Sequence, residues 1–238
     1  LVDRGVAATL DRARALISAG LVEVDGHRAG SAAQPVEQAV AIRLTDRSHP
    51  WAGRGGLKLD GALTAFGVDA NGRICLDAGA STGGFTDVLL SRGAARVYAV
   101  DVGYGQLDPR LSGDDRVVVM DRTNLRTLER LEGAPPTLVT LDLSFISLRA
   151  VFPALLRLAP AAEVVALFKP QFEVARGAVG PGGVVADPSV SAIAVSAFLE
   201  WATGQGVVSP SAPVASVVRG AKGNQEWLVH LRLPAVPS

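Results

Sequence analysis

The feature that most constrains this chain is a glycine-rich segment that joins an apolar run to a helical pattern. Residues 76–85 read Leu-Asp-Ala-Gly-Ala-Ser-Thr-Gly-Gly-Phe, and residues 85–92 place apolar side chains at helical spacing. A strand, a tight turn and a helix in this order direct backbone N–H groups and the helix N-terminus toward a ligand. The segment therefore predicts a ligand-binding turn in an α/β sheet. An ordinary glycine-rich turn without a ligand is the alternative.

The spacing of the glycines indicates which ligand the turn binds. The common dinucleotide fingerprint is Gly-x-Gly-x-x-Gly, whereas three residues separate Gly79 from Gly83 here, and Asp77 precedes them. This variant resembles the first motif of S-adenosylmethionine-dependent methyltransferases, in which the glycines admit the amino-acid part of the cofactor. The resemblance implies S-adenosylmethionine as the cofactor. The residues expected to bind it in this segment are Asp77, Gly79, Ser81, Gly83, Gly84 and Phe85.

Length and composition leave room for one α/β domain and a small additional unit. The chain has 238 residues, of which 48% are hydrophobic, and no run reaches the roughly 18 uninterrupted apolar residues that cross a bilayer. The single cysteine, Cys75, excludes an internal disulfide and a cysteine-rich metal site. The formal net charge is zero, which argues against a uniformly basic surface but allows a local basic path. We expect a cytoplasmic protein without a membrane segment or a metal.

Lysine is rare in this chain. Of the 23 lysine and arginine residues, only Lys58, Lys169 and Lys222 are lysines. Arginine stays protonated at any accessible pH, whereas a lysine can release its proton in a suitable environment. Lys58 and Lys169 are therefore candidates for chemistry that a guanidinium cannot perform. A surface position without a special role fits Lys222 equally well.

The first 46 residues predict a small α+β unit. Thr9 can cap a helix over residues 10–19, and strands are expected at residues 21–28 and 39–44. Residues 16–26 match Leu-Ile-x-x-Gly-x-Val-x-Val-Asp-Gly, so the unit resembles the ribosomal S-four-type RNA-binding domain. The resemblance implies RNA contacts, whereas a small protein-binding domain is the alternative. The basic residues expected to contact RNA here are Arg4, Arg12, Arg14 and Arg28.

Three departures from that family are visible. The family usually has Ser-Arg where Thr9 and Leu10 stand, and acidic residues offset the arginines of this unit. The chain also begins at Leu1, partway into the expected first helix, which predicts an incomplete N-terminus. These departures leave the fold assignment intact but weaken the expected RNA contact of this unit by itself.

From residue 57 onward, helical and strand patterns alternate, which predicts a doubly wound sheet. We therefore expect an α/β fold: a Rossmann-like S-adenosylmethionine methyltransferase sheet over residues 57–238, joined by a linker over residues 47–56 to the small unit. The clearest helix covers residues 188–201, and Pro153 is expected to kink any helix through residues 148–158. The expected strands are residues 73–76, 96–100, 117–120, 138–141, 164–168, 215–218 and 227–231.

Two aspartates follow the second and third predicted strands, where an open α/β sheet places its ligand. Asp101 stands 24 residues after Asp77, at the position where an acid binds ribose hydroxyls. Asp121 is placed to meet the adenine region of a cofactor. A helix cap or a solvated turn is the alternative for each.

Four further residues lie at the ends of elements that meet at the same edge. Asp142 and Lys169 end the fourth and fifth strands, Glu226 opens the last strand, and Lys58 lies on the first helix of the larger unit. Their order and setting resemble the Lys-Asp-Lys-Glu tetrad of FtsJ-like ribose 2′-O-methyltransferases. Unconnected surface salt bridges are the alternative.

Methyl transfer to a ribose hydroxyl explains why such residues are needed. The hydroxyl is a poor nucleophile until it loses its proton, and a lysine amine can accept that proton when burial and a second cation lower its pKa. We expect Lys169 to be the general base, with Lys58 as the neighbouring cation. Asp142 and Glu226 would hold the lysines and the hydroxyl in line.

Other methyl acceptors fit the sequence less well. Amino methylation of adenine usually involves an Asn/Asp-Pro-Pro-aromatic loop after the fourth strand, where this chain has Asp-Leu-Ser-Phe at residues 142–145. Carbon methylation of pyrimidines needs a cysteine nucleophile, and Cys75 lies within a predicted strand. The glycine-rich loop over residues 177–188, together with Arg54 and Arg176, is a candidate cover for bound RNA, or a plain surface loop.

The combined motifs resemble the TlyA family over essentially the whole chain. They include the Trp-containing linker at residues 49–52, the turn at residues 76–86, Asp-Val-Gly-Tyr-Gly-Gln-Leu at residues 101–107 and Lys-Pro-Gln-Phe-Glu at residues 169–173. The resemblance implies a 2′-O-methyltransferase that acts on cytidines of ribosomal RNA in assembled subunits; the choice of subunit stays open. A non-enzymatic ribosome-binding factor and a membrane-active haemolysin, a label the family has carried, are the competing hypotheses.

Overall fold

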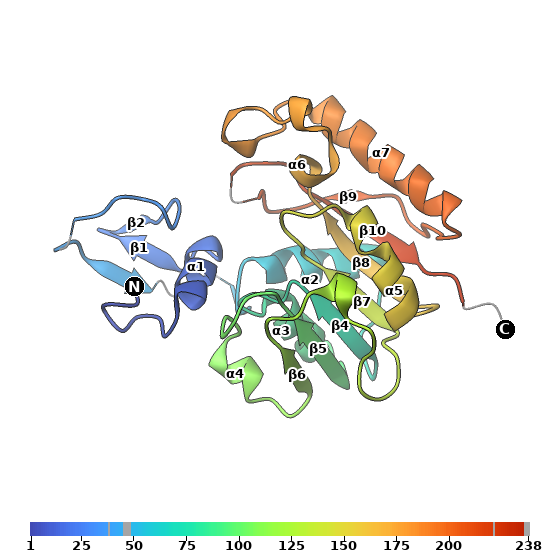
Figure 1. The fold of residues 1–238 in the computed structure, drawn as a ribbon, viewed down its shortest axis with the longest axis horizontal. Coiled ribbons are helices and arrows are strands. Elements are labelled where there is room, and N and C mark those ends of the chain that lie inside the picture. The colour runs from blue at the N-terminus through green and yellow to red at the C-terminus, as the bar shows by residue number, and fades with distance from the viewer. Residues whose placement is uncertain (38, 45–48, 221, 236–238) are drawn as a thin grey trace.

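The computed structural model describes residues 1–37, 39–44, 49–220 and 222–235. A small N-terminal unit lies beside a larger α/β unit that holds most of the chain (Figure 1). The predicted boundary between them, at residues 46 and 47, lies outside the described residues.

The N-terminal unit contains one helix and a three-stranded antiparallel sheet with the order β2-β1-β3. Thr9 caps the helix as expected, because its hydroxyl accepts a hydrogen bond from the Arg12 backbone N–H at 3.0 Å. A separate apolar cluster that includes Leu16, Leu21 and Val22 forms the core of this unit. The strands are shorter than the sequence pattern predicts. The elements are α1 (Leu10–Ser18), β1 (Val22–Val24), β2 (His27–Arg28) and β3 (Ile42–Leu44).

The larger unit is built on a seven-stranded sheet with the order β6-β5-β4-β7-β8-β10-β9. The first five of these strands run parallel, and β10 lies antiparallel between β8 and β9. This confirms the predicted doubly wound, Rossmann-like sheet. The strands are β4 (Ile74–Ala78), β5 (Arg96–Val100), β6 (Val117–Met120), β7 (Leu138–Leu141), β8 (Glu163–Phe168), β9 (Val214–Ala215) and β10 (Trp227–Arg232).

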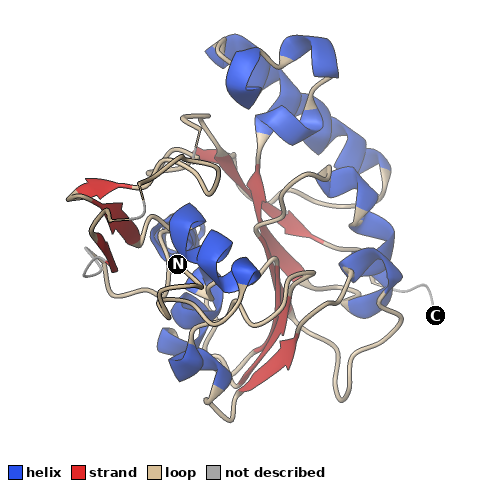
Figure 2. Ribbon diagram, turned by 60° about the vertical axis from the view of Figure 1, so that its left-hand side comes forward, coloured by secondary structure: helices blue, strands red, loops and turns tan. Residues whose placement is uncertain are grey.

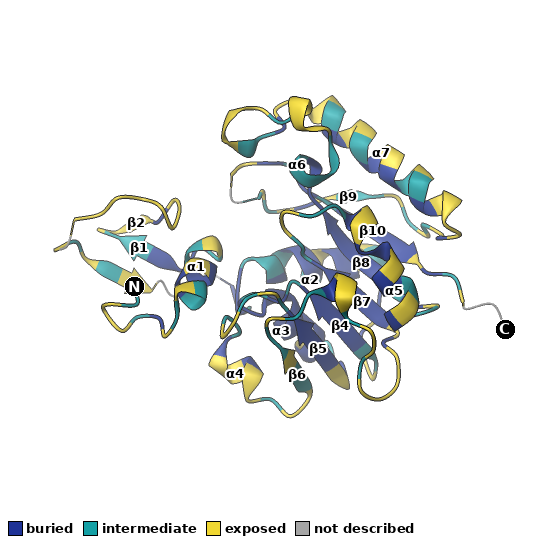
Figure 3. Cartoon of the chain, in the orientation of Figure 1, coloured by how far each residue is buried: buried dark blue, intermediate teal, exposed yellow. Residues whose placement is uncertain are grey.

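Helices cover both faces of the sheet (Figure 2). Successive strand residues point to opposite faces, so Leu76 joins an apolar cluster with Phe152 and Phe198, whereas Cys75 joins another with Leu59 and Leu89. The central strands are consequently buried on both sides (Figure 3). The helices are α2 (Gly55–Phe66), α3 (Gly84–Ser91), α4 (Pro109–Ser112), α5 (Phe152–Leu158), α6 (Pro170–Glu173) and α7 (Pro188–Gly204).

The prediction that Pro153 kinks a helix is wrong. A short 3-10 turn over Leu148–Ala150 precedes α5, and Pro153 lies in the first turn of that helix. Proline is tolerated there because the first helical N–H groups have no partner within the helix. The residue therefore helps to start α5 and does not bend it.

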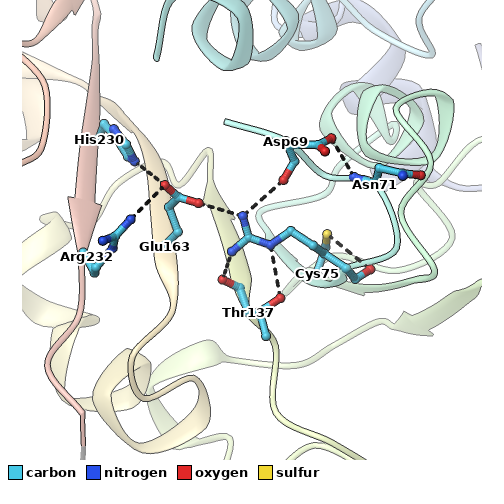
Figure 4. A network of polar contacts seen from close by, with 8 residues as sticks. Asp69, Asn71, Cys75, Thr137, Glu163, His230 and Arg232 are labelled. Carbon is cyan, nitrogen blue, oxygen red and sulfur yellow. Dashed lines mark hydrogen bonds and ion pairs between the residues drawn. The ribbon is translucent and has the colours of Figure 1, made fainter. Parts of the chain in front are cut away.

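A polar network ties the strands together at the edge opposite their carboxyl ends (Figure 4). The Arg73 guanidinium donates to Glu163 Oε2 at 2.6 Å, and His230 Nε2 lies 2.8 Å from Glu163 Oε1. Burial opposes ionisation of this carboxyl, but Arg73 and His230 outweigh it and lower the pKa of Glu163. The network links the region before β4 to the start of β8 and the end of β10.

Within the described part of the chain, none of the helices combines the length and the apolar character needed to cross a membrane. The same residues contain no group of three or more His, Cys, Asp or Glu side chains arranged to hold a metal ion.

Candidate active site

A cavity of about 850 Å³ lies where the carboxyl ends of the central strands meet the N-terminal unit. Its lining includes residues 80–82 of the glycine-rich turn, all four members of the predicted tetrad, and residues 28–32 of the N-terminal unit. The topology of an open parallel sheet predicts a ligand site at this edge. The structure thus brings the sequence-predicted catalytic residues to one cavity.

The tetrad forms two buried ion pairs. Lys58 Nζ lies 2.5 Å from Glu226 Oε2, and Lys169 Nζ lies 2.6 Å from Asp142 Oδ1. Lys58 comes from α2, whereas the other three residues adjoin the ends of β7, β8 and β10. Lys58 and Glu226 are 168 residues apart in the sequence, so only the folded sheet brings the four side chains together.

The lysines keep the Asp142 carboxyl ionised. Burial by itself would raise the pKa of this group, but the charge of Lys169 and then that of Lys58 outweigh it and lower the pKa of Asp142. The Lys169 ammonium also donates a hydrogen bond to Ser144 Oγ at 2.9 Å. The end of the Lys169 side chain is therefore held by two acceptors on the segment after β7.

The turn after β4 requires glycine at two positions. Gly79 has a φ of +86°, and a Cβ there would lie 2.5 Å from the Asp142 backbone oxygen. Gly83 has a φ of +96°, and its Cβ would lie 2.3 Å from Leu111 Cδ1. Side chains at these positions would collide with fixed neighbours as well as strain the backbone. The turn can therefore lie directly against the segment that carries Asp142.

Asp77 is fully buried beneath the turn. Its two carboxylate oxygens accept hydrogen bonds from Thr86 Oγ1 at 2.6 Å and from Thr140 Oγ1 at 3.0 Å. Burial raises the pKa of Asp77 to about 7, and the threonine hydroxyls oppose that rise. In this structure Asp77 fastens β4 to α3 and β7; its predicted contact with a cofactor stays a prediction.

The other two predicted acids organise neighbouring loops. Asp101 Oδ2 accepts from the Ser81 backbone N–H at 2.9 Å, and its Oδ1 accepts from the Gly103 N–H at 2.7 Å. Asp121 Oδ2 accepts from the Gly105 N–H at 2.8 Å. Both lie beside the turn, on adjacent strand ends, but outside the lining of the cavity. Among the predicted cofactor ligands, Ser81, Gly84 and Phe85 do line it.

The predicted RNA-binding arginines lie in different surroundings in the structure, and only some of them line the cavity. Arg28 and Arg54 line the cavity. Arg14 forms a surface pair with Asp11 at 3.5 Å, and Arg176 lies in an exposed 3-10 turn. The remaining two contact backbone carbonyls: Arg4 donates to Val40, and Arg12 donates to Gln106 of the larger unit.

Sequence reasoning missed several residues of the cavity. Phe145 is 90% exposed with a φ of +66°, and its ring lies 5.3 Å from that of Phe172. Ser144 and Phe145 follow Asp142 after one intervening residue, Leu143, so the rule that ligands lie beyond the carboxyl ends of strands could have found them. The rarity of lysine already drew attention to Lys222, which lines the cavity together with Arg219 from the loop before β10.

The fold and the site together define a Rossmann-like methyltransferase. A solved structure from Listeria monocytogenes, described as a candidate S-adenosylmethionine-dependent methyltransferase, shares this fold over 75% of this chain and 98% of its own, with a TM-score of 0.55 at 13% identity. The model of the FtsJ-like methyltransferase family matches residues 51–233. The chain belongs to the FtsJ-like methyltransferase family.

Relatives extend this likeness over nearly the whole chain. The 16S/23S rRNA (cytidine-2′-O)-methyltransferase TlyA of Mycobacterium tuberculosis is 50% identical over 98% of this chain and 87% of its own length. Hemolysin A of Brachyspira hyodysenteriae is 35% identical over 95% of both chains. A solved structure from Streptococcus thermophilus, described as a candidate hemolysin, covers 99% of this chain and 86% of its own, with 36% identity and a TM-score of 0.77.

Proposed function

We propose that this protein transfers a methyl group from S-adenosylmethionine to the 2′-oxygen of a cytidine ribose in ribosomal RNA of assembled subunits. The observation that carries the proposal is the pair of buried ion pairs, Lys58–Glu226 and Lys169–Asp142, facing one cavity beside the glycine-rich turn. The cytidine-2′-O activity named for the M. tuberculosis relative supports the choice of acceptor. Such an enzyme works in the cytoplasm, where ribosomal subunits are.

In the proposed mechanism, Lys169 is the general base. Its amine would take the proton from the ribose 2′-hydroxyl as the oxygen accepts the methyl group, which S-adenosylmethionine would supply when bound. Asp142 and Ser144 hold the Lys169 nitrogen in place. Lys58, held by Glu226, adds positive charge near Asp142. Orientation of this kind supplies much of the rate of a bimolecular transfer.

The residues around the turn fit an S-adenosylmethionine ligand. The turn enters the cavity through Ser81, Thr82 and Gly84, and the α3 N-terminus points its first backbone N–H groups toward this end of the sheet. Asp101 follows β5 and retains lone pairs beyond the two N–H groups that it accepts. When bound, the cofactor supplies the electrophilic methyl group, and these residues position it.

The charge of the cavity supports RNA as the other substrate. Although the whole chain has a formal net charge of zero, six basic and two acidic residues among those that the structure describes line the cavity. Positive charge concentrated at one place attracts a phosphodiester chain even when the whole protein is neutral. The exposed Phe145 ring at the same place offers a face on which a base can stack. The basic lining residues are Arg28, Arg54, Lys58, Lys169, Arg219 and Lys222.

Transfer of labelled methyl from S-adenosylmethionine to separated, unmodified small and large ribosomal subunits tests the proposal. We expect label in ribosomal RNA, at a cytidine whose 3′-phosphodiester resists alkaline cleavage because the 2′-oxygen is blocked. The labelled subunit settles which one is the substrate.

Two results would contradict the proposed function. Label on a base would exclude the ribose acceptor. The absence of label, with cofactor bound and subunits still associated, would favour a non-enzymatic ribosome-binding factor. Release of dye from liposomes by the purified protein would instead support a membrane-active protein.

A further inference from the structure

Two arginines from different units of the molecule meet at one glycine. A Cβ on Gly20 would lie 3.0 Å from Arg54 Nε and 3.2 Å from Arg28 Nε, so both guanidiniums approach the same backbone position. Arg28 ends β2 of the N-terminal unit, whereas Arg54 directly precedes α2 of the larger unit. The absence of a side chain on Gly20 leaves the space that the two guanidinium groups share.

This pair of like charges lacks a close neutralising partner within the part of the chain that the structure describes. Among those residues, neither arginine forms an ion pair with a carboxylate; Arg54 donates to the Ser18 backbone oxygen at 3.2 Å. Burial and then the charge of Arg28 lower the pKa of Arg54, and the charge of Glu226 opposes that effect. Two adjacent cations repel each other, so an anion between them would relieve an unfavourable contact.

The arginine pair lies in the cavity where methyl transfer is proposed to take place. Arg28 and Arg54 line the same cavity as Lys58, Lys169 and the glycine-rich turn. Guanidinium groups suit phosphate because their planar donors match its oxygens in a two-pronged geometry. A phosphate held here would contact both units at once.

We propose that Arg28 and Arg54 together bind a single phosphate of the substrate RNA backbone and thereby join the N-terminal unit to the catalytic unit. The inference rests on the proposed action on RNA. It adds a specific site at which the two units act as one binding surface. The N-terminal unit then contributes to substrate positioning through Arg28, although Thr9 and Leu10 replace the Ser-Arg that its sequence family usually carries.

The salt dependence of RNA binding tests whether one phosphate is shared. Binding of unmodified ribosomal subunits is measured without cofactor over a range of salt concentrations, for wild type, Arg28→Ala, Arg54→Ala and the double variant. Each phosphate contact contributes about 0.7–0.9 to the slope of log K against log salt concentration. We expect the slope measured for the double variant to be smaller in magnitude than that of wild type by about 0.7–0.9, the value of one phosphate contact. Its affinity should be lower by at least about tenfold.

Three control measurements make the result specific. Arg43→Ala removes an exposed arginine of β3, in the same unit but outside the cavity, and should change affinity less than twofold. The double variant Arg28→Lys, Arg54→Lys keeps both charges, so its slope of log K against log salt concentration should be close to that of wild type. Thermal unfolding and cofactor titration establish that the alanine variants are folded.

Each other outcome overturns the inference. If the slope of the double variant falls by about twice the value for one phosphate contact, the arginines bind separate phosphates. If the slope is unchanged, they bind none. A loss of cofactor affinity in the alanine variants would assign the pair to the cofactor carboxylate. Because binding is measured without methyl transfer, a wild-type protein that binds subunits but does not methylate them would contradict the proposed function and leave this inference standing.

Discussion

Lys169 is the residue on which the proposed chemistry depends. Its ammonium is held between Asp142 and Ser144, so the side chain is already positioned before any substrate arrives. A general base must accept the proton of the ribose hydroxyl, which distinguishes a catalytic lysine from one that only holds a carboxylate in place.

Substitution of Lys169 by arginine separates charge from proton transfer. The new guanidinium would keep a positive charge beside Asp142 but stay protonated, because an arginine side chain does not release its proton at accessible pH. We expect both Lys169→Arg and Lys169→Ala to lower kcat about 10²–10⁴-fold while cofactor affinity, measured by calorimetry, is retained. A rate near that of wild type in the arginine variant would exclude Lys169 as the general base.

The raised pKa of Asp77 predicts how the free energy of unfolding depends on pH. Because its pKa is raised to about 7 in the folded protein from the ordinary value of 3.8, the native state keeps a proton that the unfolded chain has already lost over this range. The free energy of unfolding should therefore fall as pH rises from about 4 to about 7, by on the order of 1 kcal/mol per pH unit.

The control for this prediction is Asp77→Asn, which keeps the shape of the side chain and removes the titration. Its unfolding free energy, measured by urea denaturation at several pH values, should lack that component of the pH dependence. Parallel pH profiles for wild type and variant would contradict the raised pKa of Asp77.

At the scale of elements, the glycine-rich turn and the segment after β7 are in direct contact. A Cβ on Gly79 would reach the Asp142 backbone oxygen at 2.5 Å and adopt an unfavourable φ of +86°. A side chain added at Gly79 would therefore displace the segment that carries Asp142 as well. The two parts of the site depend on each other because their backbones touch.

Gly79→Ala should accordingly lose both stability and function. We expect a loss of about 2–4 kcal/mol in unfolding free energy and weaker cofactor binding. The matched control is Gly61→Ala, in the exposed interior of α2, where a Cβ meets nothing within 4 Å. That variant should gain about 0.5–1 kcal/mol, since alanine favours helix over glycine. Equal effects in the two variants would show that the packing of the turn against Asp142 is unimportant.

In the whole molecule, the two opposite ends of the strands have different roles. The carboxyl ends of the strands carry the cavity, whereas the opposite edge carries the network around Glu163 (Figure 4). Arg73 and His230 join this carboxylate from elements far apart in the chain. Stability and function can therefore be altered separately.

Glu163→Ala should destabilise the fold by about 2 kcal/mol at pH 7 without changing cofactor affinity. Because the pKa of Glu163 is lowered in the folded state, its contribution is present above the ordinary value of 4.5 and is lost as pH falls below it. The difference from wild type should consequently shrink at about pH 3. Glu200→Ala, an exposed change on α7, should stay within about 0.5 kcal/mol; a shift in cofactor affinity for Glu163→Ala would contradict the separation of the two edges.

Local sequence patterns were enough to predict the sheet and to name all four residues of the candidate tetrad. Strands over residues 96–100, 117–120 and 138–141 are observed with the predicted bounds. The central strand over residues 138–141 is buried throughout, and a parallel strand buried on both faces must be continuously apolar. The edge strand over residues 117–120 is only partly buried but is just as apolar in sequence. Lys58, Asp142, Lys169 and Glu226 could be named because each adjoins the end of an element that the pattern locates. Local patterning failed at Pro153, since the same residue can start a helix or bend one.

Only the tertiary structure decided which side chains pair and what the N-terminal unit contributes. The pairing of Lys58 with Glu226 and of Lys169 with Asp142, the exposure of Phe145, and the meeting of Arg28 with Arg54 at Gly20 all join residues that no local pattern connects. Local hydrogen bonding and apolar periodicity are encoded within a few residues of chain. Electrostatic pairing depends on distances across the sheet and between the two units, and those distances exist only after the apolar clusters have packed.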